Sequence, residues 1–508
     1  MLRRLERPDF HIDEKDAAVR IADAEFPVPF AHRLEFNAPV HGTWNIVHIG
    51  LMVPDCHQIY VCADNCMRGV VLTAAEMGAG DRFSSVLIEE NDLYDQNLET
   101  ITIEGVSDVI RRLPYRPRAV TVFLVCLHHF VGTDAAFVFK TLEERFPDID
   151  FMRCWMDPVM QKTGLTPEQK LKESMFRPVR PLPVDPGLVC VLGDNQALDP
   201  DSDISQTVRE AGGRILQLND WKKHGERIGI SYLRKAVTDK EAQEAYSFMV
   251  PCENYDDYLR IGSAGLFITR SPLGVHGVYQ LAKRLGRPFL YLPPVCGEDR
   301  IRQELSKLRL ALRDNLQQTA GTAGTAGISG TAGTDAGEPD AAETNHLAGS
   351  IRDESSASKA LQHALGLIGD TEITIDYILN PRVLSLARRL LEAGFRVTRV
   401  YLDAILPEEE EDFLWLQKNY PDLILNATIH PKMRVLHNAE NEGKMLALGP
   451  KAAWFGGTAH FVNLVDYGGL WGDSGIEKLA ALMEDAWLHE KDTRSIVPRK
   501  GQGCACVL

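Results

Sequence analysis

Four cysteines are the residues of this chain whose type and spacing could do chemistry together. Cys56, Cys62 and Cys66 lie close in sequence, and Cys126 directly follows the apolar run 119–125. Cys62 and Cys66 have i, i+4 spacing, so on a helix both sulfur atoms would share one face. Cys126 lies where a buried strand would end, which is where open α/β sheets place their sites. Clustered thiols without an export signal favour a metal or redox centre over disulfides.

Thiolates are the natural ligands of iron–sulfur clusters, and four per [4Fe–4S] cluster is the common number. We therefore interpret the four cysteines as candidate cluster ligands. For Cys62 and Cys66 the alternative is core packing, if the local helix directs only one of them inward. Three histidines flank the thiols, and we expect them to form hydrogen bonds or to lie at the surface: His57, His128 and His129.

Strands that alternate with helices must position these residues. Such alternation predicts parallel sheets covered on both faces. The sequence therefore predicts an α/β protein of three Rossmann-like parallel-sheet lobes. The expected strands include 119–125, 188–192, 214–218, 265–269, 288–292, 372–378 and 396–401. The expected helices include 135–145, 277–285, 381–393 and one that begins after Thr166, where Thr-Pro-Glu-Gln forms a capping box.

A repetitive segment marks one domain boundary. Residues 316–358 repeat Thr-Ala-Gly and then become polar, so they cannot bury enough apolar surface to offset the entropy of ordering. We predict a disordered linker there. The complete division is an N-terminal extension (1–24), an iron–sulfur-bearing α/β lobe (25–180), a second α/β lobe (184–315), the linker, a third α/β lobe (365–490) and a flexible tail (491–508).

Composition limits the partners and the compartment. A chain of 508 residues is long enough for about three domains. Its formal charge of −16 argues against nucleic acid or an anionic membrane as a partner. The first residues lack a secretory h-region and no apolar run reaches the length of a spanning helix, so we expect a cytoplasmic protein. No Gly-x-Gly-x-x-Gly or P-loop pattern follows a strand, so we expect no nucleotide on this chain.

Several ordered motifs resemble the nitrogenase component 1 family, which includes catalytic nitrogenase subunits, cofactor-assembly scaffolds and nitrogenase-like reductases. The segment 42–49 leading to Cys56, and the segment 125–134 with Cys126, are similar to the family's two cluster-cysteine segments. The stretches 82–92, 286–288 and 466–472 are similar to further family motifs in the same order. Together they span most of residues 40–490. The resemblance implies cluster ligation by Cys56 and Cys126.

Departures from the family pattern argue against an orthodox molybdenum nitrogenase. A further cluster cysteine would fall near Ala31, the thiol that binds the metal cofactor near Arg270, and the cofactor's histidine near Asn463. Arg270 could instead bind a carboxylate or phosphate of an organic substrate, with an interface salt bridge as the alternative. His460 could donate a proton in the same cavity.

The resemblance implies the iron–sulfur subunit of a nitrogenase-like reductase. Such a subunit would accept electrons from a separate ATP-dependent iron–sulfur reductase protein and pass them to a substrate or cofactor between the lobes. The cluster could be shared at an interface with a second component 1-like subunit or with a second copy of this chain. The alternatives are a non-catalytic scaffold for metal-cofactor assembly, a structural partner subunit, and an α/β regulatory protein without a cluster.

Overall fold

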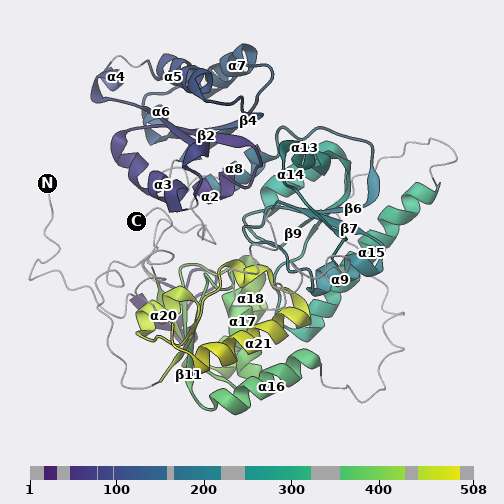
Figure 1. The fold of residues 1–508 in the computed structure, drawn as a ribbon. Coiled ribbons are helices and arrows are strands. Elements are labelled where there is room, and N and C mark those ends of the chain that lie inside the picture. Colours follow the sequence, from purple (N-terminus) through teal and green to yellow (C-terminus); the bar gives the residue numbers. More distant parts are fainter. Residues whose placement is uncertain are drawn as a thin grey trace, which may run out of the picture.

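Three sheets of mainly parallel strands, each with its own helices, build the molecule in the computed structural model (Figure 1). This confirms the predicted α/β class and the three Rossmann-like lobes. The structure describes residues 17–30, 46–76, 78–94, 97–156, 165–218, 246–321, 355–428 and 444–491. Ala31 and the C-terminal thiols Cys504 and Cys506 lie outside these residues.

The first lobe contains a four-stranded parallel sheet in the order β3-β2-β4-β5. Its strands are β2 (Cys56–Cys62), β3 (Phe83–Leu87), β4 (Ala119–Val125) and β5 (Asp150–Met156). One face packs against α5 (Leu98–Arg112) and α7 (Ala135–Arg145) through alternate residues such as Ile59 and Val61. The other face packs against α2 (Ile46–Gly50), α3 (Asp64–Glu76) and α8 (Pro167–Met175), and its core continues into the second lobe. The short helices α4 (Glu90–Tyr94) and α6 (Cys126–Phe130) follow β3 and β4.

The second lobe has a five-stranded parallel sheet in the order β10-β9-β6-β7-β8. Its strands are β6 (Asp185–Val191), β7 (Arg214–Gln217), β8 (Met249–Val250), β9 (Ala264–Thr269) and β10 (Phe289–Tyr291). Its helices are α9 (Asp203–Glu210), α13 (Tyr255–Leu259), α14 (Val275–Leu285) and α15 (Glu298–Gly321). Helix α15 continues past residue 316, where we predicted the linker to begin, because the residues 315–320 are still compatible with a helix.

The third lobe has a six-stranded sheet in the order β1-β13-β12-β11-β14-β15. Five strands are parallel: β11 (Glu372–Asp376), β12 (Arg396–Leu402), β13 (Ile424–Ala427), β14 (Leu446–Leu448) and β15 (Phe461–Val462). Its helices are α16 (Ser356–Ile368), α17 (Val383–Glu392), α18 (Glu410–Asn419), α20 (Pro450–Gly456) and α21 (Gly472–Leu488). Helix α16 therefore begins before the predicted end of the linker at residue 358.

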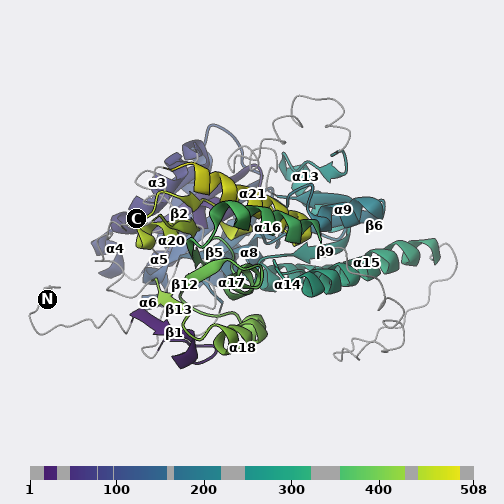
Figure 2. The same cartoon turned by 90° about the horizontal axis from the view of Figure 1, so that it is seen from below.

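The first described strand joins the lobe that is most distant in sequence. β1 (Ala18–Arg20) pairs antiparallel with β13 at the edge of the third sheet (Figure 2). Ile21 lies within the third lobe's core. The segment that we predicted as an N-terminal extension thus contributes a strand to the third lobe.

None of the helices in the described ranges is long and apolar enough to cross a membrane.

Candidate functional site

Three of the four predicted cysteines gather at the carboxyl edge of the first sheet. Cys62 is the last residue of β2, and Cys126 comes directly after β4. These strands are parallel neighbours, with Val61 opposite Leu124, so their ends meet at one edge. Cys66 lies on α3, which follows β2. Figure 1 shows α3 and α6 at the same end of this sheet.

The three thiols lie near enough to one another to influence their pKa values. Burial, with smaller effects of the charges of Cys66 and Asp64, raises the pKa of Cys62 to about 12. Burial also raises the pKa of Cys66, with Cys126 as the next cause. The thiols of Cys62 and Cys66 are therefore protonated near neutral pH. A metal centre here would have to displace protons, which couples its binding to pH.

Three thiols are donors of the kind that iron–sulfur clusters take. Among the described residues, no three His, Cys, Asp or Glu side chains lie close enough to hold one metal ion. A [4Fe–4S] cluster binds each thiolate through a different iron atom, so its ligands lie further apart than those of a single ion. Apolar neighbours such as Met67 and Leu127 would exclude water from it. Three thiols leave one iron for a ligand from another chain or from outside the described residues.

Cys56 lies at the opposite end of the sheet. It is the first residue of β2 and pairs with Ala119, the first residue of β4. Cys126 comes seven positions after Ala119, which corresponds to about 20 Å along a strand. Cys56 is buried, its Sγ lies 3.1 Å from Thr121 Oγ1, and burial raises its pKa to about 11. One small cluster cannot bind both cysteines within this chain.

The local secondary structure explains why Cys62, and not Cys56, lies beside Cys66 and Cys126. We expected Cys62 and Cys66 on one helix, but β2 runs to Cys62 and α3 begins only at Asp64. The turn between them brings Cys66 back to the strand end. Cys62 therefore lies at the end of β2, beside Cys126, which follows the end of the neighbouring strand β4.

The nearby histidines have other roles. His128 is buried, its Nδ1 accepts from the Val125 amide at 3.2 Å, and its Nε2 lies 3.2 Å from Thr102 Oγ1. Burial lowers its pKa to about 4. Because both ring nitrogens are engaged, His128 positions α6 and is not a metal ligand. His129 packs edge-on against Trp155.

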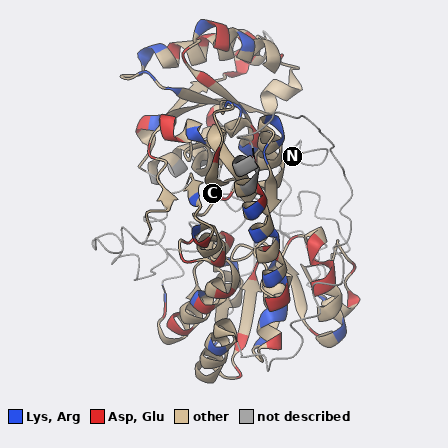
Figure 3. Ribbon diagram, turned by 90° about the vertical axis from the view of Figure 1, so that its right-hand side faces the viewer, with Lys and Arg blue, Asp and Glu red and all other residues tan. Residues whose placement is uncertain are grey.

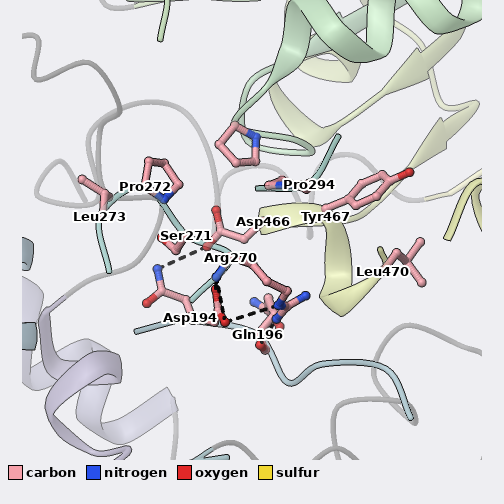
Figure 4. A pocket seen from close by; sticks show the side chains of 12 residues that line it. Asp194, Gln196, Arg270, Ser271, Pro272, Leu273, Pro294, Asp466, Tyr467 and Leu470 are labelled. Atoms are coloured by element: carbon pink, nitrogen blue, oxygen red, sulfur yellow. Dashed lines mark hydrogen bonds and ion pairs between the residues drawn. The ribbon is translucent and has the colours of Figure 1, made fainter. Parts of the chain in front are cut away.

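A small cavity with charged and apolar lining residues lies between the second and third lobes. Arg270 follows β9, is buried and lines this cavity together with Asp194 and Asp466. Its Nε is 3.3 Å from Asp194 Oδ2, and its Nη2 donates to the Gln196 carbonyl at 2.8 Å (Figure 4). The guanidinium thus holds the loop 194–196 against β9, which favours the salt-bridge alternative. The cavity volume is about 30 Å³, which is space for about two water molecules.

A buried network that we did not predict connects this cavity to the first lobe. Lys172 Nζ lies 2.6 Å from Glu168 Oε1 on α8, with both side chains buried. Asn195 donates to Glu168 at 3.0 Å and to Asp466 at 3.2 Å, so it joins all three lobes. In the sequence, only the i, i+4 spacing of Glu168 and Lys172 indicated this network. Such spacing is usually that of a solvent-exposed ion pair.

His460 does not lie in this cavity. It precedes β15, and its backbone carbonyl accepts from Ala447 near the start of β14, so it lies at the amino edge of the third sheet. Its Nδ1 lies 2.9 Å from the Ala486 carbonyl on α21. The cavity is at the opposite edge, where Asp466 follows β15. The structure therefore separates His460 from Arg270, although we expected them together.

Sequence comparisons find no relative. No protein-family profile matches the chain, and no curated protein sequence is similar to it. Comparison of structures does find similar proteins. A nitrogenase Cp1 structure at pH 6.5 superimposes with a TM-score of 0.56 at 12% identity, covering 89% of this chain and 93% of the other. A nitrogenase Cp1 structure at pH 5 covers 93% and 94%, with a TM-score of 0.48 and 11% identity. The first of these two likenesses shows that the chain has a nitrogenase component 1-like fold.

Proposed function

We propose that this chain is the electron-accepting iron–sulfur subunit of a nitrogenase-like reductase. The observation that carries the proposal is the meeting of Cys62, Cys66 and Cys126 at one sheet edge within a nitrogenase component 1-like fold. These three thiolates would hold a [4Fe–4S] cluster, which supplies a one-electron relay when bound. Cys56 is not part of this ligand set.

The protein's own contribution is to keep the relay dry and to fix its ligands. The rigid end of β2 positions Cys62, and His128 holds the turn that carries Cys126 by accepting from the Val125 amide. Burial and the low polarity around the thiols would tune the reduction potential of the centre.

The exposed surface at this edge supports a protein partner. Three large apolar side chains are exposed there: Leu87 at the end of β3, Phe130 at the end of α6 and Phe137 in the first turn of α7. Exposed apolar residues that cluster on one surface mark interaction sites. We propose that a second component 1-like chain, or a second copy of this one, covers this edge and supplies the missing ligand. An ATP-dependent iron–sulfur reductase protein would deliver the electrons.

A partner or scaffold role without catalysis is the second candidate. The small cavity beside Arg270 favours it, because about 30 Å³ does not admit an organic substrate or a metal cofactor. The guanidinium that could bind such a substrate is already paired with Asp194. In this alternative the chain holds the cluster and passes electrons to a partner subunit where the substrate binds.

Cysteine variants test the ligand set. After anaerobic cluster reconstitution, the single variants Cys62→Ser and Cys126→Ser should lose most of their iron and the EPR signal of the reduced protein. Cys66→Ser should destabilise the cluster towards oxygen or change its EPR spectrum. Cys56→Ser and Cys252→Ser are matched controls outside the site and should retain the wild-type signal. Loss of the cluster in Cys56→Ser but not in Cys62→Ser would overturn the assignment.

A further inference from the structure

A second group of polar side chains lies at the amino edge of the first sheet. His57 is the second residue of β2 and is almost completely buried. Its Nε2 lies 2.8 Å from Ser84 Oγ on β3, and its Nδ1 lies 2.7 Å from the Tyr115 hydroxyl. Ser84 is half-buried and Tyr115 is partly exposed, so solvent reaches both ends of the group.

The hydrogen bonds determine where the protons lie. The Tyr115 hydroxyl donates its only proton to the Asp81 carbonyl at 3.1 Å, because a carbonyl can only accept. It must therefore accept from Nδ1–H of His57. Burial and the charge of Arg82 lower the pKa of His57 to about 4, so the ring is neutral near pH 7 and carries only that proton. Nε2 is then an acceptor, and the Ser84 hydroxyl donates to it.

The surrounding backbone holds this arrangement in place. Arg82 donates to the carbonyls of Cys56 at 3.0 Å and Val53 at 2.7 Å, which fixes the start of β2 relative to β3. Ser84 pairs with Ile59 in the register of these parallel strands. The group is also separate from the thiols, since His57 and Cys62 are five residues apart on β2, or about 16 Å.

A serine that donates to a histidine whose tautomer is set by a third group has the arrangement of an activated nucleophile. We propose that Ser84 accepts an acyl group from small activated esters, with His57 as general base and Tyr115 as positioning residue. The Ser84 oxygen attacks the ester carbonyl carbon while its proton passes to His57 Nε2. The carbon–oxygen bond to the alcohol breaks, and the leaving alkoxide takes the proton from Nε2. The products are acyl-Ser84 and a free alcohol.

Acetylation by p-nitrophenyl acetate tests the proposal on the full-length protein. We expect release of p-nitrophenolate together with an acetyl group on the peptide that contains Ser84, detected by mass spectrometry. Ser84→Ala should remove that modification, and the neighbouring variant Ser85→Ala should keep it. An unmodified Ser84 in folded wild-type protein, or equal acetylation of the same peptide in Ser84→Ala, would overturn the proposal.

Two variants separate the roles of base and positioning residue. His57→Gln should slow acetylation of Ser84 about 100-fold, the usual contribution of a general base. Because His57 is buried, this variant could unfold, so Tyr115→Phe provides the second test. It should lower the maximal acetylation rate without changing the ester concentration at half-maximal rate. An unchanged maximal rate in Tyr115→Phe would contradict its positioning role. The cluster's EPR signal should persist in both Ser84→Ala and Tyr115→Phe, which keeps this test independent of the proposed function.

Discussion

At the scale of single residues, the buried pair of Lys172 and Glu168 matters most to how the lobes are held together. The two charges are 2.6 Å apart, and Asn195 extends their network to Asp466 in the third lobe. Removing one charge of a buried pair leaves the other without compensation in a medium of low polarity. Removing one charge of this pair should therefore lower the free energy of unfolding far more than removing one charge of an exposed pair.

Lys172→Met should lower the free energy of unfolding by about 3–5 kcal/mol, measured by urea denaturation. The matched control is Lys140→Met, which removes an exposed i, i+4 pair with Glu144 and should change stability by less than about 1 kcal/mol. The double variant Lys172→Met/Glu168→Leu should recover much of the loss. Equal effects of Lys172→Met and Lys140→Met would contradict the structural role of this pair.

The candidate ligands could be predicted as residue types but not as a set. Cysteine chemistry singled out Cys62, Cys66 and Cys126, and the structure places them together. Cys56 was included because the segment 42–49 before it resembles a family cluster-cysteine motif, but the structure places it at the start of β2, away from the other three thiols. Arg270 was expected in the inter-lobe cavity and lies there, whereas His460 lies at the opposite edge of the third sheet.

At the scale of elements, the turn 466–469 closes the cavity between two lobes. Asp466 and Tyr467 both adopt left-handed backbone conformations, and the Gly469 carbonyl accepts from the Asp199 amide of the second lobe at 3.0 Å. A Cβ atom at Gly469 would overlap the Ala197 carbonyl oxygen. Only glycine permits this approach of the two backbones.

Gly469→Ala should therefore destabilise the protein by about 1–3 kcal/mol more than Gly212→Ala, because overpacking adds to the backbone strain. Gly212 also has a positive φ, but a Cβ atom there would meet nothing within 4 Å. Thermal unfolding of both variants against wild type measures the difference. Similar melting temperatures for the two variants would mean that the contact between the lobes is not as close as described.

Elements with strong local signals could be predicted from the sequence. β4 and α7 have the predicted bounds, and α8 begins with the predicted capping box of Thr166 and Gln169. β2 was not predicted, because His57 and Gln58 are unusual in a buried strand. Gln58 is satisfied there by donating to the Val47 carbonyl at 2.9 Å and accepting from Tyr60. Such partners come from the tertiary structure and leave no local pattern.

At the scale of the whole molecule, Asn195 joins the three lobes through Glu168 and Asp466, and large apolar side chains are exposed at the thiol edge of the first lobe. Charged residues of both signs alternate along the helices, and the strands carry few of them (Figure 3). The thiol edge also exposes large apolar side chains, with Phe130 70% exposed and Leu87 49% exposed. Burying this edge against another chain would remove apolar surface from water and shield the cluster.

Phe130→Glu should therefore weaken assembly, because it places a charge in the proposed interface. Sedimentation of the cluster-loaded protein should give a dimer for wild type and a monomer for the variant. Leu488→Glu is the control, since Leu488 is similarly exposed at the end of α21 in the third lobe. Monomeric wild-type protein that retains its cluster would rule out a homodimeric interface at this edge.

The most direct test of the central claim is the iron content of the protein itself. We expect anaerobically purified wild-type chain, produced together with cluster-assembly machinery, to contain about four iron and four acid-labile sulfide atoms per cluster. Reduction should produce the EPR signal of a [4Fe–4S] centre, and that signal should be lost in Cys126→Ser. Iron near zero in folded wild-type protein would contradict the account.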